Sequence, residues 1–487
     1  MAAAAISILI PYGMSSPDTP NVEPSTPNVE PSTPNVEPST PNVEPSTPNV
    51  EPSTPNVEPS TPNELIVPDT GVTSPTVDTL PTISAQNLHF PSSTAELDIA
   101  VSRATSILDE EITPIPDSIA AANNGFAINF YRQVSDGNSN IFFSPLSMFV
   151  VFSAVYEGAR EDSADQLQKA FGFEPDFEVR YNDTIRLISS INRDDPHAEL
   201  DLANALWVDD EFNPKEPYVN AVRGVYLADV EVVDFMNNSE SGGAERINAW
   251  ASEKTHGKID RVIDYETAMT LSLALTNAVY FNGTWEKPFP ESKTYEGTFY
   301  KSSSETVKAE FMYNAHGGTF TDEPDGYQIL KLPYEGDRLS MLVILPDDYD
   351  GIDDIEKTIS SDQLAQWTKN QERWQETEVI LPKFKIETKY DLEDPLFYLG
   401  VHDIFDYEMA NLTGIWQGHE KLFVSTAVQK AYVDVNEQGT EAAAVTVTGF
   451  TITSAPPRFV ADHPFIFIIQ DDESGTILFM GRISDPT

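Results

Sequence analysis

Two continuous apolar runs in the second half of the chain predict buried β-strands. Residues 340–345 (SMLVIL) and 465–469 (FIFII) have the length of strands and carry no charge on either face. Such runs are typical of strands that are covered on both sides. We therefore expect both runs to lie inside sheets.

A serine followed by a proline predicts the start of a helix. Ser144 can cap the free N–H groups, and Pro145 fits the first helical position, where its missing N–H has no partner. The apolar run that follows is expected to end near Gly158. Helical patterns come mainly early and strand patterns mainly late, so we predict an α+β fold rather than alternating βαβ units.

The N-terminal region has a different pattern, which forms no core. From Pro20 the heptapeptide PNVEPST occurs six times, and its two prolines per repeat forbid a helix. We interpret residues 16–117 as a disordered, Pro-rich linker that acts as an extended spacer, and residues 118–487 as the folded domain. A neutral repeat with no role is the alternative.

The first residues leave two interpretations open. Residues 2–10 (AAAAISILI) are apolar but no basic residue precedes them, whereas a secretory signal has a basic start. Residues 1–15 are interpreted as a signal segment shortened at its beginning, with an ordinary flexible terminus as the alternative. Together with the spacer, the first interpretation places the protein outside the cell or at its surface.

Composition excludes several classes of function. The 487 residues include 78 acids, 29 bases and no cysteine, which gives a net charge of −49. Disulfides and thiol chemistry are excluded, nucleic acid and anionic membranes would be repelled, and no apolar stretch is long enough to span a membrane. The acidity indicates a salt-tolerant or extracellular surface, or simply solubility.

Motifs for enzyme chemistry are incomplete. His316-Gly317-Gly318 resembles an esterase oxyanion loop, but no G-x-S-x-G nucleophile motif accompanies it. Around Asp348 a calcium-like loop fails, since Pro346 and Lys357 occupy ligand positions. The seven histidines show no ligand spacing, so we expect surface or structural roles for them, no cofactor, no metal and no enzyme activity.

One segment has the composition of a strand that can enter an existing sheet. Residues 439–448 (GTEAAAVTVT) are small or β-branched, without proline. At a period of two, one face carries Thr440, Ala442, Ala444, Thr446 and Thr448, and the other carries Glu441, Ala443, Val445 and Val447. The first face is small enough to be buried. A static surface strand is the alternative interpretation, but it leaves this long uncharged face unexplained.

Several collinear segments stand out within residues 118–487: 140–147 (NIFFSPLS), 276–289 (TNAVYFNGTWEKPF), 332–346 (LPYEGDRLSMLVILP), 381–386 (LPKFKI), 428–444 (VQKAYVDVNEQGTEAAA), 463–469 (HPFIFII) and 478–485 (LFMGRISD). Together they resemble the serpin family, whose inhibitory members act on serine proteases. The resemblance implies a fold with a large mixed sheet A, smaller sheets and surrounding helices.

The resemblance implies an inhibitory mechanism. In the family, a protease cleaves a reactive-centre loop, whose hinge then inserts into sheet A while the protease stays trapped as an acyl-enzyme, a mechanism that general accounts of strand addition use as an example. The residues that resemble the hinge are Glu437, Gly439, Thr440, Glu441, Ala442, Ala443 and Ala444. Inhibitory members share a small hinge of this kind.

Family spacing from Glu437 and from Pro464 places the cleaved bond at Thr453–Ser454, with Ile452 and Ser454 as alternative positions for the attacked residue. A small residue there suits subtilisin-like proteases first and elastase-like proteases second, since trypsin-like enzymes require Arg or Lys. Attack after Phe450 by a chymotrypsin-like enzyme is the alternative that both spacings disfavour.

The resemblance also implies a set of residues that control opening of the sheet. Ser144, Ser147 and Asn277 match the shutter beneath sheet A, and Trp285 matches the breach tryptophan at its top. Where the family commonly has a histidine, this chain has Gln429, which can both donate and accept hydrogen bonds but does not titrate. The heparin-binding cluster of some members is not matched, because Arg180, Arg186 and Arg193 are scattered among acids.

The sequence therefore predicts a monomeric inhibitor of serine proteases, secreted or tethered at a surface. The alternative from a different class is a non-inhibitory module with the same fold that binds a partner or has a structural role.

Overall fold

The computed structural model describes residues 115–191, 198–239, 241–323, 326–336, 338–364, 375–440 and 457–487. The repeats and the segment at residues 1–15 lie outside the described residues, so their interpretation stays a prediction. The α-helices are α2 (Asp117–Val134), α3 (Pro145–Gly158), α4 (Glu161–Phe171), α5 (Phe177–Ile191), α6 (Glu216–Val225), α7 (Gly243–Lys254), α8 (Tyr265–Ala268), α9 (Ile352–Thr358) and α11 (Glu393–Tyr398). Six of these begin before residue 250, as the α+β prediction requires.

Helix α3 confirms the predicted start and end. The side chain of Ser144 accepts a hydrogen bond from the backbone N–H of Ser147, Pro145 is the first helical residue, and the helix ends at Gly158. All of its residues are buried, which explains why its sequence is apolar on every side.

The larger of two sheets has nine strands and contains both predicted apolar runs. Its order is β1-β15-β14-β8-β7-β6-β9-β13, with β5 paired to β6. The bounds are β1 (Ile141–Phe143), β5 (Tyr295–Tyr300), β6 (Thr306–Glu323), β7 (Tyr327–Pro333), β8 (Leu339–Pro346), β9 (Gln375–Pro382), β13 (Arg458–Val460), β14 (Phe465–Asp471) and β15 (Ile477–Ile483). Strands β8 and β14 pair antiparallel and are buried throughout, so both strand predictions are confirmed.

The second sheet has six strands in the order β10-β11-β12-β4-β2-β3. The bounds are β2 (Ala198–Asp209), β3 (Asp229–Val233), β4 (Leu273–Thr284), β10 (Phe384–Asp391), β11 (Thr426–Val435) and β12 (Gly439–Thr440). Parallel and antiparallel pairs both occur in it, so the sheet is mixed.

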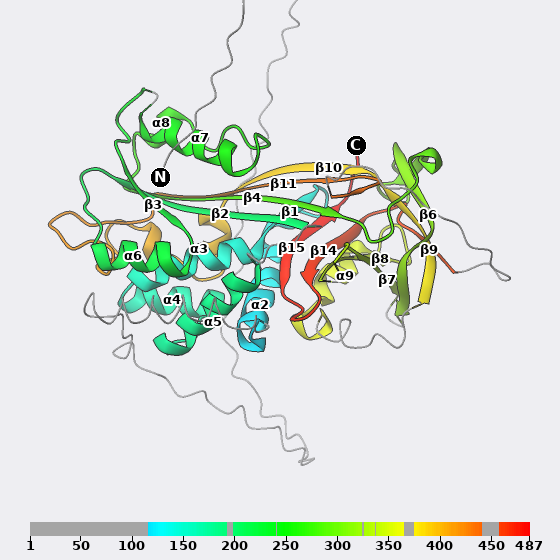
Figure 1. Ribbon diagram of the computed structural model, residues 1–487, viewed down its shortest axis with the longest axis horizontal. Coiled ribbons are helices and arrows are strands. Elements are labelled where there is room, and N and C mark those ends of the chain that lie inside the picture. Colours follow the sequence, from blue (N-terminus) through cyan, green and yellow to red (C-terminus); the bar gives the residue numbers. More distant parts are fainter. Residues whose placement is uncertain are drawn as a thin grey trace, which may run out of the picture. The chain divides into compact units, whose positions relative to one another are not determined.

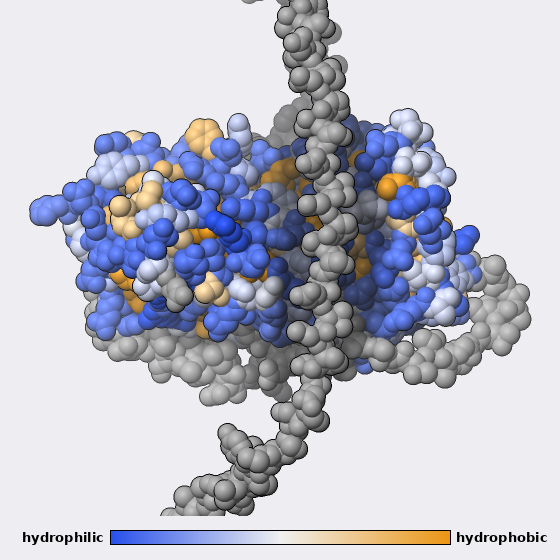
Figure 2. Space-filling view, turned by 90° about the horizontal axis from the view of Figure 1, so that it is seen from above, coloured by the Kyte–Doolittle hydropathy of each residue, from blue (hydrophilic) through white to orange (hydrophobic). Residues whose placement is uncertain are grey.

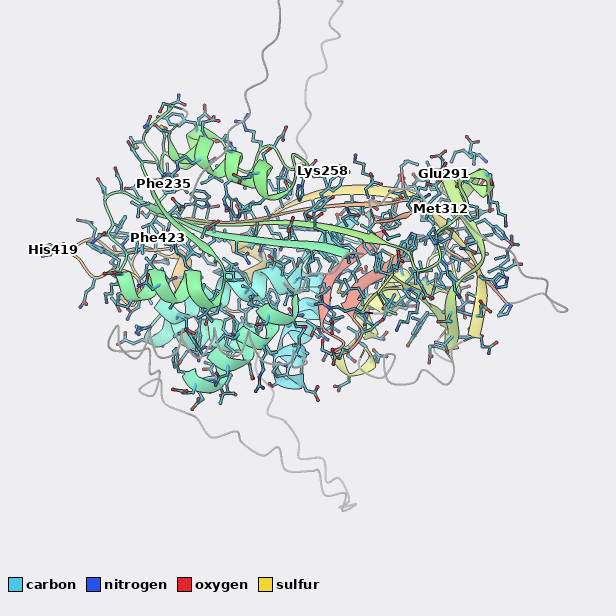
Figure 3. All side chains as sticks on the ribbon, in the orientation of Figure 1. Phe235, Lys258, Glu291, Met312, His419 and Phe423 are labelled. Carbon is cyan, nitrogen blue, oxygen red and sulfur yellow. The ribbon has the colours of Figure 1, made fainter. Side chains whose placement is uncertain are left out.

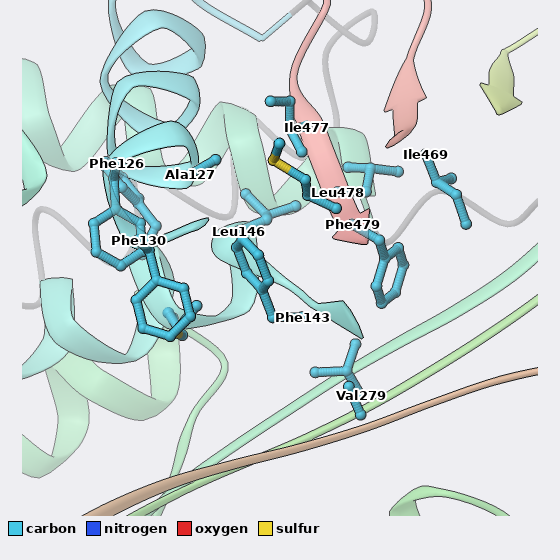
Figure 4. Close-up of a cluster of buried hydrophobic side chains, with 14 of the residues drawn as sticks. Phe126, Ala127, Phe130, Phe143, Leu146, Val279, Ile469, Ile477, Leu478 and Phe479 are labelled. Carbon is cyan, nitrogen blue, oxygen red and sulfur yellow. The ribbon is translucent and has the colours of Figure 1, made fainter. Parts of the chain in front are cut away.

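The six-stranded sheet lies between two helical layers (Figure 1). On one face, which we call the inner face, lie α3 and the other early helices, and on the opposite, outer face lie α7 and α8. Figure 4 shows the inner-face core, where Phe143, Leu146 and Phe479 approach Val279 of β4. A second apolar cluster joins the outer face to α7 and includes Ala278 and Val428.

The outer side of α7 and α8 is mainly hydrophilic, with scattered apolar residues (Figure 2). Among the described residues, no helix is both long and apolar enough to cross a membrane.

Candidate functional site

The central feature of the six-stranded sheet is a seam between two parallel strands. Strands β11 and β4 pair directly from Thr426 opposite Ala274 to Tyr432 opposite Tyr280. Beyond this last pair they separate, and the short strand β12 lies between them, antiparallel to both. The first residues of the predicted hinge are thus already paired at the open end of the seam.

A tight turn brings β12 into this position. Strand β11 ends at Val435, the turn spans residues 436–439, and Thr440 then lies opposite Val435 and Gly283. Gly439 is required here by close packing, because an added Cβ would lie 2.0 Å from the carbonyl oxygen of Gly283. The turn therefore fixes the register of β12 against β4 and β11.

Trp285 and Tyr334 support β12 from the inner face. The indole Nε1 of Trp285 donates to the carbonyl oxygen of Asn436 at 3.1 Å, and its ring stacks on Tyr334 with centroids 4.5 Å apart. The hydroxyl of Tyr334 lies 2.8 Å from Oγ1 of Thr440, which is fully buried. Burial raises the pKa of Tyr334, so the phenol stays protonated and can donate.

Glu437 anchors the turn through its side chain. Its carboxylate accepts from the hydroxyl of Thr294 at 2.7 Å and lies 3.1 Å from Nζ of Lys383. Burial acts to raise the pKa of Glu437, but the hydrogen bond from Thr294 and the charge of Lys383 outweigh it, and the pKa lies below its ordinary value. The carboxylate is therefore ionised and held at neutral pH.

The shutter residues form one connected network halfway along the seam. Asn204 of β2, Asn277 of β4 and Gln429 of β11 lie opposite one another on three adjacent strands. The amide of Gln429 donates to Oδ1 of Asn277 at 2.7 Å, and this hydrogen bond crosses the seam. The amide of Asn277 in turn donates to Oδ1 of Asn204 and to Oγ of Ser147.

The same network reaches the start of α3. The Gln429 side chain accepts from the N–H of Ser144 at 3.0 Å and donates to the carbonyl oxygen of Ser144 at 2.9 Å. The hydroxyl of Ser144 donates to Leu478 of β15 at 2.8 Å. These residues are buried, so separating β4 from β11 would break the Gln429–Asn277 hydrogen bond and leave buried polar groups without that partner.

The structure thus brings together Ser144, Ser147, Asn277 and Gln429, and separately Trp285, Glu437, Gly439 and Thr440. Residues 441–456, which include Glu441, Ala442, Ala443, Ala444, Thr453 and Ser454, lie outside the described residues. Their assignment stays a prediction. The chain is described again from Pro457, and β13 then pairs with β9.

Sequence reasoning missed four residues of the site: Asn204, Thr294, Tyr334 and Lys383. Tyr334 and Lys383 lie inside segments that carried the family resemblance, but no local pattern shows which side chain they meet. Of the scattered arginines, Arg180 is buried and forms an ion pair with Glu157, its Nε 2.9 Å from Oε1. It is therefore part of the core rather than of a polyanion site.

Comparison with known proteins agrees with this geometry. A family model described as serpin (serine protease inhibitor) matches residues 121–486. Leukocyte elastase inhibitor of Bos taurus is 37% identical over 76% of this chain and its own full length. An uncharacterized serpin-like protein of Thermococcus kodakarensis is 36% identical over 76% of this chain and 86% of its own.

Solved structures give the same result. Serpin48 of the insect Tenebrio molitor superposes with a TM-score of 0.67 at 31% identity, over 76% of this chain and 98% of its own. Uncleaved ovalbumin superposes with a TM-score of 0.70 at 28% identity, over 76% of this chain and its own full length. The six-stranded sheet, whose strands β4 and β11 contain parts of the family-like segments at residues 276–289 and 428–444, is sheet A of this fold. The chain belongs to the serpin family of serine protease inhibitors.

Proposed function

We propose that this protein inhibits serine proteases by offering its reactive-centre loop for cleavage and inserting the loop into the seam of sheet A. The observation that carries this proposal is the placement of β12 at the open end of the seam. It is supported by relatives named as elastase inhibitors. Family membership itself points to protease inhibition rather than to catalysis by this chain.

If the register of β12 continued along the chain, each inserting residue would have a defined position in the sheet. Thr440 lies opposite Gly283 and Val435, and antiparallel pairing advances one residue at a time in opposite directions. Ala443 would then come between Tyr280 and Tyr432. Thr446 would come between Asn277 and Gln429, at the shutter.

Both faces of the new strand would meet suitable surroundings. Thr440 points to the inner face, towards Tyr334, so Ala442, Ala444 and Thr446 would follow it into the space above α3. On the outer face, Val445 and Val447 would extend the apolar cluster between the sheet and α7. The two faces of the segment therefore match the two layers that cover the sheet.

Insertion would also increase the number of backbone hydrogen bonds. It breaks the parallel ladder between β11 and β4, which has seven paired positions, and forms an antiparallel ladder on each side of the new strand. Each intramolecular hydrogen bond contributes about 1 kcal/mol net. The exchange of one ladder for two would drive the reaction forward.

Covalent capture would precede insertion. The serine hydroxyl of the protease attacks the carbonyl carbon of Thr453 and loses its proton to the catalytic histidine. The bond to the nitrogen of Ser454 breaks, that nitrogen takes the proton, and an ester joins Thr453 to the protease. Insertion of residues 441 onward would then carry the ester-linked protease along the sheet before water hydrolyses the ester.

The length of the seam favours Thr453 over Phe450 as the attacked residue. The far end of the seam is at Leu273 and Thr426, which in the same register would lie opposite Phe450 and Gly449. Cleavage after Phe450 would leave no residue between the filled sheet and the protease. Cleavage after Thr453 would leave three residues between the filled sheet and the protease. Cleavage after Ile452 would leave two, and cleavage after Ser454 would leave four.

A small attacked residue suits proteases with a shallow primary pocket. Subtilisin-like enzymes are our first target class and elastase-like enzymes our second. The names of the similar leukocyte elastase inhibitors are consistent with the second class. We further propose that the protein acts as a monomer outside the cell or at its surface, carried on the Pro-rich spacer.

A non-inhibitory binding role is the competing proposal. One similar solved structure, at 28% identity and a TM-score of 0.69, is human thyroxine-binding globulin in complex with its ligand. The small residues that follow β12 favour insertion instead.

Incubation of the full chain with subtilisin and with elastase tests the proposal. We expect a band on a denaturing gel near the summed mass, and a released C-terminal fragment that begins at Ser454 by mass spectrometry. Complete cleavage without such a band, for every protease tested, would contradict inhibition. A fragment that begins at Thr451 would show that the cleaved bond follows Phe450, and the target class would then be chymotrypsin-like.

A further inference from the structure

A short segment after α7 crosses the outer face of sheet A at the upper end of the seam. We call residues 255–258 the strap. Figure 3 shows Lys258 just beyond α7, above the sheet. The ring of His256 lies against Tyr280 of β4, with centroids 5.1 Å apart, and Nζ of Lys258 lies 5.4 Å from the ring centroid of Tyr432 of β11.

These contacts place the strap across the seam itself. Asp201 of β2 lies opposite Tyr280, and Tyr280 lies opposite Tyr432, so the three residues form a row across β2, β4 and β11. Tyr432 and Tyr280 are the last directly paired residues before β12. The strap therefore covers the first position that an inserting loop would open.

His256 is the point at which the strap meets two carboxylates of β2. Its Nε2 lies 3.1 Å from Oδ2 of Asp201 and 3.5 Å from Oε1 of Glu199. Glu199 and Asp201 are two residues apart on β2 and so share its outer face. Within the described part of the chain, neither carboxylate forms an ion pair with a lysine or arginine.

The spacing of these atoms is that of ligands around a small metal ion. Zn²⁺ binds imidazole nitrogen and carboxylate oxygen at about 2.0–2.2 Å, so neighbouring ligand atoms in a tetrahedral site lie about 3.4 Å apart. One nitrogen and two oxygens converge here, and all three ligand atoms lie within 4.8 Å of one another. Their exposure leaves room for water as a further ligand.

We propose that Glu199, Asp201 and His256 bind a divalent transition-metal ion of the Zn²⁺ type, and that the bound ion fastens the strap over the seam. An imidazole ligand favours such ions over Ca²⁺ and Mg²⁺, which take oxygen ligands. The ion would cancel the two negative charges and join β2 to a segment that also contacts β11. Resting on the proposed function, this predicts that the metal slows separation of β4 from β11 and therefore slows loop insertion.

Zinc titration of the chelator-treated full chain tests the site directly. Isothermal calorimetry with ZnCl₂ is expected to show one site, and His256→Asn should weaken it more than about tenfold, because even side chains that only orient a ligand are worth this much. Asn suits the position, since His256 has a φ of 51° and Asn tolerates this region. His419→Asn, in a distant exposed loop (Figure 3), is the matched control.

Equal zinc affinity in the wild type and His256→Asn would overturn the site. The regulatory part has a separate measurement, the rate of complex formation with subtilisin with and without zinc. If zinc lowers the rate of complex formation in the wild type but not in His256→Asn, the fastened strap is supported. If zinc leaves the wild-type rate unchanged, the regulatory part is overturned. If no protease forms a complex, the proposed function fails, while the calorimetric result still decides the site.

Discussion

The contact between Tyr334 and Thr440 holds β12 at the open end of the seam through one side chain. Thr440 is fully buried in the uncleaved protein and its hydroxyl meets the phenol of Tyr334. Strand β12 is thus already paired with both β4 and β11 in the uncleaved protein. A charged replacement of Thr440 would disturb the uncleaved sheet as well as the inserted one, so this position is a poor test of insertion alone.

Tyr334→Phe isolates the contribution of this contact. The ring and its stacking on Trp285 remain, but the Thr440 hydroxyl loses its partner inside the sheet. We expect a loss of about 1 kcal/mol in the free energy of unfolding, measured by urea denaturation of the uncleaved protein. Tyr398→Phe, at a residue that is 74% exposed, should change nothing. An equal effect of both variants would contradict this role for the hydroxyl.

Glu437 gives the turn a pH dependence with a defined sign. Its pKa in the folded protein is lowered, so its contribution to stability is present above the ordinary glutamate pKa of about 4.3 and is lost as the pH falls through the lower folded pKa. The stability difference between the wild type and Glu437→Gln should therefore be full at neutral pH and disappear in acid. A difference that grows on acidification would show the opposite sign.

At the scale of elements, the apolar strands, the cap of α3 and the order of helices before strands followed from local pattern, because period, capping and run length are properties of neighbouring residues. The pairing of Asn204, Asn277 and Gln429 did not, since it joins three strands far apart in the chain. The resemblance supplied two of these residues, Asn277 and Gln429, and only the register supplied Asn204. The early pairing of β12 had no local signal either.

Ala444→Arg tests the proposed insertion in the segment that follows β12. In the proposed insertion, the register of β12 continued along the chain would put this residue on the inner face, where an unpaired charge is costly to bury. We expect insertion to slow until hydrolysis prevails, so that the gel shows cleaved protein instead of the covalent complex. Glu441→Arg places the same side chain on the outer face beyond the seam and should keep the complex. Loss of the complex in both variants, or in neither, would contradict the assigned faces.

At the scale of the whole molecule, the Pro-rich region is separate in sequence from the segments that form the seam. The strands and helices that form the seam all begin after residue 115. The repeats at residues 20–61 have too few apolar side chains to bury against the domain.

Deletion of residues 20–61 should therefore leave both stability and inhibition in solution unchanged. The melting temperature and the rate of complex formation with subtilisin are the two measurements, made on the full chain and the deletion variant at the same ionic strength. A shift of several degrees would show that the repeats contact the domain.

The tight turn at residues 436–439 determines which face of a strand each later residue would occupy if the segment after Thr440 paired in the same register. Because Val435 is paired with Thr440, this pair would set the register of the residues that follow. Side chains on a strand alternate between its two faces. Removal of one residue after Thr440 would exchange the two faces, so that the valines would turn towards α3 and the threonines towards α7. Removal of two would restore the faces but shorten the reach beyond the sheet. Under the proposed mechanism, substitutions at the bond offered to the protease would leave the register unchanged, whereas a change in the number of residues before that bond would alter either the faces or the reach.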